Sequence, residues 1–184
     1  MAQLVYIGGY GWSGSTLLEM LMTIDPDVVG CGETVGALRP WNIDRRCSCG
    51  RGPHECPVWG PLLAAMESRA GWRHEELDAG LRRIVSPGHS MMVDSSNTAW
   101  GEALSPFRLR RAFAEDFQLV HLVRDPRAVC WSITKDEIKR ADREGGRAKI
   151  LRRCFVGATG WITANLACEL FGWLYPGTVS APPL

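Results

Sequence analysis

The pattern of apolar and polar positions along this chain has two forms, one typical of strands and one typical of helices. The first example of each form lies near the N-terminus. LVYI at residues 4–7 is a short apolar run typical of a buried strand. Beyond a glycine-rich stretch, apolar residues recur at helical spacing and predict a helix over about residues 15–24 with one apolar face, formed by Leu17, Leu18, Leu21 and Met22.

The same alternation continues to about residue 173, with turn residues between the segments. Strands are predicted at residues 27–31, 91–94 and 117–123, and helices at 61–68, 75–85, 101–114, from Pro126 onward and at 150–173. Residues 174–184 are predicted to be a tail without regular structure. Strands that alternate with helices predict an α/β fold with a mostly parallel central sheet flanked by helices.

Composition narrows the class of protein but not its chemistry. The 184 residues predict a single domain over 1–184, and a net charge of +1 gives no sign of nucleic acid as a partner. The N-terminus has no basic leader, and we expect no membrane span and a cytoplasmic location. The seven cysteines are then expected to be thiols or ligands rather than disulfides.

The glycine-rich stretch GGYGWSGST, residues 8–16, is similar to a phosphate-binding loop. Gly9, Gly14 and Thr16 have the spacing G-x-x-x-x-G-x-T, and Ser15 stands where a nucleoside-triphosphate enzyme has lysine. The only lysines in the chain are Lys135, Lys139 and Lys149. Backbone N–H groups and a helix start still attract an anion, so the loop favours a group smaller than a Mg²⁺-polyphosphate. The alternative is a tight turn without a ligand.

A second segment with candidate anion-binding residues, RDPRAVCWS, follows the clearest predicted strand. Arg124 stands at the strand end, and Ser132 lies about two turns into the next helix. Arginine can grip a phosphate with two parallel hydrogen bonds, and a helix start adds its dipole. A surface pair of arginine and aspartate with a helix cap is the alternative interpretation.

Together, GGYGWSGSTLLEMLM, VVGCGET, VDSSN and FQLVHLVRDPRAVCWS resemble the bacterial-type sulfotransferases that use 3′-phosphoadenosine 5′-phosphosulfate (PAPS) and release 3′-phosphoadenosine 5′-phosphate (PAP). The resemblance implies a three-layer, P-loop-like nucleotide-binding fold and no metal requirement. It also implies sulfuryl transfer to a hydroxyl of a carbohydrate, lipid or small metabolite. By resemblance, Arg124 and Ser132 hold the 3′-phosphate, and the loop holds the 5′-phosphosulfate through Gly11, Trp12, Ser13, Gly14, Ser15, Thr16 and Leu17.

A base must take the proton of the acceptor hydroxyl. Glu33, in CGET after a predicted strand, is the candidate, because a glutamate in a similar segment has this role in related enzymes. A surface or helix-capping carboxylate is the alternative for Glu33. Asp94 is a weaker candidate base and belongs to a predicted active-site loop of Asp94, Ser95, Ser96 and Asn97.

Three departures from the family pattern favour other functions. Trp12 stands where the family loop has arginine or lysine, and Asn97 stands where relatives often have lysine. The family domain is also longer than this chain, which we expect to be a short or C-terminally incomplete member. These departures favour a catalytically weak member that binds PAPS or PAP as the alternative function. A P-loop phosphotransferase is a third function, and the absent loop lysine counts against it.

Residues 39–58 are predicted to be an irregular, cysteine-rich insertion. Cys47, Cys49, His54 and Cys56 fall within ten residues and are candidate zinc ligands. A disulfide between Cys49 and Cys56 and plain loop packing are the open alternatives. Elsewhere, Trp131, Trp161 and Trp173 lie on predicted helices and are expected in the core.

Overall fold

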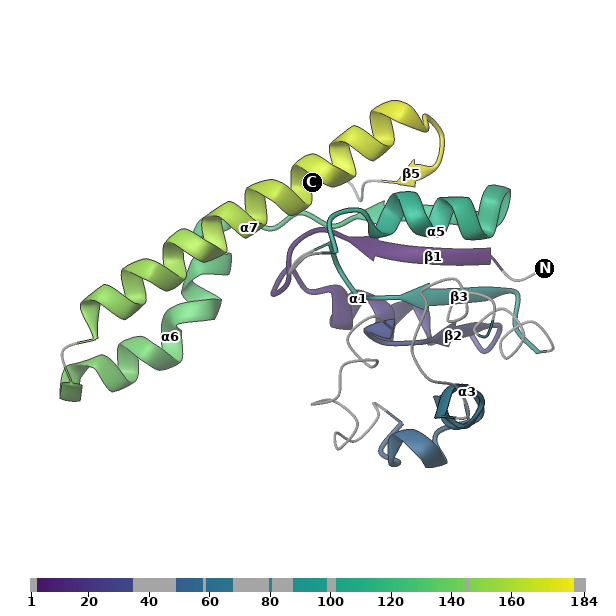
Figure 1. Ribbon diagram of the computed structural model, residues 1–184, viewed down its shortest axis with the longest axis horizontal. Helices are drawn as coiled ribbons and strands as arrows, with labels where there is room; N and C mark the ends of the chain where they lie inside the picture. The colour runs from purple at the N-terminus through teal and green to yellow at the C-terminus, as the bar shows by residue number, and fades with distance from the viewer. Residues whose placement is uncertain are drawn as a thin grey trace. The chain divides into compact units, whose positions relative to one another are not determined.

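The structure is a computed structural model that describes residues 3–34, 49–57, 59–67, 80, 88–98, 102–144 and 146–180. In this part of the chain the fold is α/β, with a five-stranded parallel sheet in the order β2-β3-β1-β4-β5, flanked by helices (Figure 1). The strands are β1 (Gln3–Gly8), β2 (Val28–Gly30), β3 (Met91–Asp94), β4 (Phe117–His121) and β5 (Val179–Ser180). The α-helices are α1 (Ser15–Met22), α3 (Trp59–Glu67), α5 (Ser105–Phe113), α6 (Pro126–Glu144) and α7 (Arg147–Leu174), and the short 3₁₀ helices are η2 (Pro53–Glu55) and η3 (Ala114–Asp116).

These elements confirm the predicted alternation of strands and helices, with one error at the C-terminal end. The segment predicted to be a tail contains β5, which pairs in parallel with β4 through Leu119↔Val179 and Val120↔Ser180. Two residues are too few to show a hydrophobic period, so this strand could not be predicted from the sequence. The predicted helix at 75–85 lies outside the described residues, apart from Gly80.

The chain divides into two compact units, and the first contains the described residues of Met1–Tyr6, Thr16–Ser96 and Phe107–Gln118. Here β3 pairs in parallel with both β1 and β2, so that Met91 is opposite Gln3 on one side and Val28 on the other. The buried side chains of this unit include Leu4, Val5, Tyr6, Cys31, Trp59, Leu63, Met92, Val93, Leu109, Phe113 and Phe117.

Helix α1 presents a different face to the protein from the one that the sequence predicted. Leu17 and Leu21 are 63% and 56% exposed, whereas Glu19 is only 8% exposed. Hydrogen bonds explain this orientation of the helix. The Glu19 carboxylate accepts them from the Gly32 N–H and from the Ser95 hydroxyl, both at 2.6 Å. The helix therefore turns its glutamate inward toward the segments that follow β2 and β3.

The second unit contains the described residues of Ile7–Ser15, Asn97–Pro106 and Leu119–Leu184. Its helices α6 and α7 pack as an antiparallel hairpin (Figure 1). Gly157 permits close packing of the two helices, because a Cβ there would lie 2.9 Å from Ile133 Cδ1 on α6. Gly160 permits close approach of the loop after β1, because a Cβ there would lie 2.6 Å from the Tyr10 ring. Tyr10 is buried in this small core together with Val129 and Ala164, and Ile133 and Trp161 pack against them.

Large apolar side chains on α6 and α7 are exposed, which corrects the prediction for two tryptophans. Trp131 and Trp173 are 60% and 78% exposed, because each is two positions from a buried residue, Val129 and Phe171, and therefore points to the opposite side of its helix. Helix α7 is also long and apolar enough to cross a membrane, since an 18-residue stretch of it has a mean hydropathy of 1.2, although core helices of soluble proteins have the same properties.

Candidate anion-binding site

The loop between β1 and α1 depends on glycine at both ends. Gly9 has φ 128° and Gly14 has φ 100°, in the left-handed region that side chains disfavour. A Cβ at Gly9 would collide with the carbonyl oxygen of Leu122, whereas one at Gly14 would meet nothing within 4 Å. Gly9 thus packs directly against the backbone of Leu122, whereas the space beside Gly14 is open. Trp12 also has a positive φ, of 63°, at the exposed tip.

Thr98, which sequence reasoning missed, fastens the start of this loop. Its hydroxyl accepts a hydrogen bond from the Gly9 N–H at 3.1 Å and has the carbonyl oxygens of Gly9 and Ala164 within donating distance, at 2.8 and 3.2 Å. The Thr98 N–H also donates to the Gly9 carbonyl, at 2.8 Å. A threonine in the strand-end segment DSSNT was the only sign of this role in the sequence.

Hydrogen-bond donors gather where the loop enters α1. The first N–H groups of a helix have no partner within the helix, and the first turn of α1 carries no acidic side chain. The Ser13 hydroxyl is shielded from solvent and has no hydrogen-bond partner in the described part of the chain. A shielded donor of this kind normally has a partner, so the loop offers a donor to a ligand. Ser15, the first residue of α1, is buried.

Arg124 connects the loop to the end of β4. Its Nη1 donates a hydrogen bond of 2.7 Å to the Trp12 carbonyl oxygen, and its own carbonyl accepts one of 2.9 Å from the Trp161 indole N–H. The side chain is exposed and the guanidinium has five N–H donors, so the bond to Trp12 leaves donors for an anion beside the loop. Ser132 lies in the same unit, half-buried on α6.

The remainder of the RDPR motif has the local structural role that was the alternative interpretation. The Asp125 carboxylate accepts the Arg127 backbone N–H at 2.8 Å, which caps α6, and it pairs with the Arg127 guanidinium at 2.5 Å. The hydrogen bonds from the Arg127 side chain and backbone lower the pKa of Asp125 to about 2. Asp125 and Arg127 therefore form an ion pair on the surface. Arg124 is the arginine that is hydrogen-bonded to the loop.

A separate polar network lies in the first unit and includes most of the predicted loop 94–97. Asp94 is buried and accepts hydrogen bonds from the Thr34 hydroxyl and from the N–H and hydroxyl of Ser96, at 2.5–2.8 Å. Burial raises the pKa of Asp94, and these hydrogen bonds oppose the rise. Asp94 thus orders the turn at Ser96. Asn97, in the second unit, has φ 53° and is buried.

Glu19 is the second buried carboxyl of this network, and no motif in the sequence marked it as a functional residue. Burial is the main cause that raises its pKa, the bonds from Ser95 and Gly32 lower it, and the charges of Asp94 and Glu33 raise it further. Glu33 itself belongs to the same unit and is exposed. The role of Glu33 as a base remains a prediction, as do the ligand contacts of Thr16 and Leu17, which are both exposed.

The cysteine segment is described only from Cys49 onward, so Cys47 lies outside the described residues. Cys49 and Cys56 are thiols, and Cys56 is buried where η2 leads into α3. Among the described side chains no group of three or more histidine, cysteine or acidic residues could hold a metal ion. The described part of the segment thus packs against α3 through η2.

Comparison of the chain with models of known protein families found no match, and a search of curated proteins found none either.

Proposed function

We propose that this protein is a sulfotransferase that binds PAPS and transfers its sulfuryl group to a hydroxyl acceptor. The observation that carries the proposal is the loop before α1, where the shielded Ser13 hydroxyl lacks a partner in the described residues and Arg124 is fastened to the Trp12 carbonyl. The four sequence segments that resemble the family supply the identity of the anion. The P-loop-like character of the fold is part of the same proposal.

The chemistry of these donors suits a phosphosulfate. No lysine stands in the loop, so its attraction for an anion comes from N–H and hydroxyl dipoles and from Arg124. A dense triphosphate with Mg²⁺ requires a lysine charge and metal-binding carboxylates in addition. The open space at Gly14 lets a ligand approach the backbone closely.

Each residue then has a defined task. The loop N–H groups and the Ser13 hydroxyl hold the 5′-phosphosulfate end, and Arg124 with Ser132 holds the 3′-phosphate. Glu33 takes the proton of the acceptor hydroxyl as the oxygen attacks. When bound, PAPS supplies the sulfuryl group, so that an oxygen–sulfur bond forms on the acceptor, the bond from sulfur to the phosphate oxygen breaks, and PAP leaves.

Calorimetric titration with PAP, without metal, tests the proposal on the wild type, on Arg124→Ala and on Arg127→Ala. Hydrogen bonds to charged groups contribute about 1.5–3 kcal/mol, so Arg124→Ala should weaken binding about 10- to 150-fold. Arg127→Ala is the matched control, because its guanidinium is paired with Asp125 on the surface. Absence of PAP binding by the folded wild type, or equal losses in the two variants, would refute the proposal.

Trp12 supports a second candidate, a protein that binds PAP or PAPS but turns over poorly. Its indole provides one neutral donor where a cation would stabilise the leaving group. The variant Trp12→Arg separates the two candidates. A large gain in kcat with little change in PAP affinity identifies a protein whose natural form is a weakened enzyme. A requirement for Mg²⁺ in nucleotide binding would instead indicate a phosphotransferase.

A further inference from the structure

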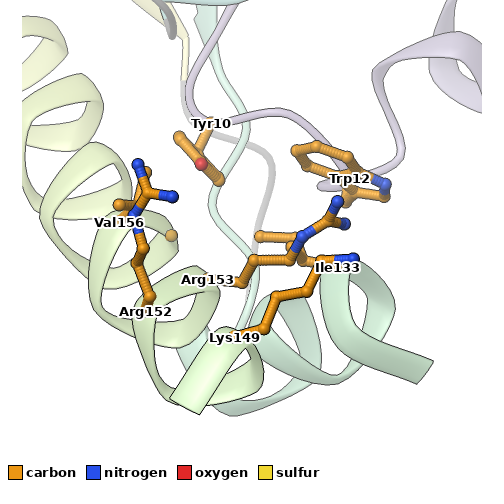
Figure 2. Close-up of a pocket in the computed structure, with 8 residues that line it drawn as sticks. Tyr10, Trp12, Ile133, Lys149, Arg152, Arg153 and Val156 are labelled. Atoms are coloured by element: carbon orange, nitrogen blue, oxygen red, sulfur yellow. The ribbon is translucent and has the colours of Figure 1, made fainter. Parts of the chain in front are cut away.

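A pocket of about 410 Å³ lies within the second unit, between the loop after β1 and the helices α6 and α7 (Figure 2). This volume falls in the range of sites for small organic molecules and exceeds what a lone sulfate needs. The lining consists of cationic, aromatic and aliphatic residues and one glycine, and none of the lining residues is acidic. They are Tyr10, Trp12, Ile133, Lys149, Arg152, Arg153, Val156 and Gly157.

The cations come from one face of one helix. Lys149, Arg152 and Arg153 are spaced i, i+3 and i+4 at the start of α7, so they are neighbours on its surface. The first turn of α7 has no acidic residue, and the helix N-terminus adds a positive partial charge on the same side. In Figure 2, Arg153 extends toward Trp12 and Lys149 toward Ile133 on α6. This side of the pocket therefore favours a negatively charged group.

The opposite side of the pocket is aromatic. The rings of Tyr10 and Trp12 lie with their centroids 6.1 Å apart and their planes inclined by 37°. Tyr10 is held in place because its ring packs against the bare backbone at Gly160, and Trp12 is 45% exposed. Ile133 and Val156 extend the apolar lining. Surfaces of this kind bind the flat apolar body of a ring compound.

We propose that this pocket binds the hydroxyl acceptor, and that the acceptor is an anionic compound with an aromatic or alicyclic ring. The assignment as an acceptor rests on the proposed function, whereas the ligand class rests on the pocket itself. The ring packs against Tyr10 and Trp12, and the carboxylate or other anionic group meets the cations of α7. This proposal gives a reason for Trp12 at a position where the family has a cation, because the indole forms one wall of the pocket.

A matched pair of compounds tests the ligand class. Calorimetry compares 6-hydroxy-2-naphthoate with 2-naphthol, which lacks the carboxylate, on the wild type with and without saturating PAP. The naphthoate should bind at least about 10-fold more tightly, as expected for one charged hydrogen-bonded contact. In the triple variant Lys149→Gln, Arg152→Gln and Arg153→Gln the two compounds should bind equally, and the affinity for PAP should change less than about two-fold. Arg147→Gln, an exposed α7 cation outside the pocket lining, is the control.

The outcomes separate this proposal from the proposed function. Equal binding of both compounds by the wild type, or an equal effect of the control variant, overturns the ligand class. If the triple variant weakens PAP binding as strongly as naphthoate binding, the pocket belongs to the nucleotide and the acceptor assignment is wrong. If the protein binds no PAP and still discriminates between the two compounds, the ligand class stands and the sulfotransferase proposal fails.

Discussion

Gly9 and Gly14 have the same kind of backbone conformation, and replacing each by alanine separates two costs. Both have a φ that side chains disfavour by about 1–2 kcal/mol, and the stiffer unfolded chain of alanine offsets about 0.4–1 kcal/mol. Gly14→Ala should therefore lose about 1 kcal/mol. Gly9→Ala should lose about 2–4 kcal/mol, because its Cβ also collides with the Leu122 carbonyl, and an overpacked site costs about 1–3 kcal/mol more.

Urea unfolding, followed by the fluorescence of the eight tryptophans, measures the stability of the two variants. Their losses of affinity for PAP should have the opposite order, with the larger loss in Gly14→Ala. A methyl group at Gly14 occupies the open space where the anion is proposed to lie, so Gly14→Ala should lose affinity strongly and stability little. Equal losses of stability in the two variants would refute the contact between Gly9 and Leu122 as the reason for glycine at that position.

Three further predictions concern the contacts around the loop and α1. Thr98→Val should lose about 2 kcal/mol of stability in urea unfolding, because the buried Gly9 N–H loses its acceptor, and Thr98→Ser should lose less; the reverse order would contradict this role. Burial raises the pKa of Glu19 above its ordinary value of 4.5, so the stability from its neutral form is full below about pH 4.5 and is lost as the pH rises through the raised value. Glu19→Gln should therefore gain stability relative to the wild type as the pH rises above about 4.5, and a pH-independent difference would show that this carboxyl does not titrate as stated. Trp161→Phe removes the hydrogen bond to the Arg124 carbonyl and should weaken PAP binding about 2- to 10-fold, unless that bond has no positioning role, in which case affinity stays unchanged.

The elements that the sequence predicted well are those with strong local signals. MMVD, predicted as a strand at 91–94, is β3 with the same bounds, and Pro126 begins α6 as expected of proline in a first helical turn. Helix α7 begins at Arg147, three residues before the predicted start, because the charged residues there are good helix formers that carry no apolar period. The strand β5 had no local signal at all.

The sequence could indicate the loop and Arg124 because their residue types follow strand ends at a recognisable spacing. It could not reveal that Glu19 points inward, because a glutamate among leucines and methionines normally marks the solvent side of a helix. Its hydrogen-bond partners, Gly32 and Ser95, lie 13 and 76 residues away in the chain, beyond the helix itself. The pocket was equally hidden, since it joins residues near position 10 to residues near position 150.

Tyr10 and Gly160 are 150 residues apart in the chain, but their contact means that the residue at one position limits which residues the other position can accept. As long as an aromatic ring occupies position 10, any side chain at position 160 must displace that ring, and the ring forms part of the pocket wall. Substitutions at these two positions are therefore not independent. A chain with the same fold can acquire a larger residue at 160 only together with a smaller one at 10, and it then has a wider pocket for a bulkier ligand.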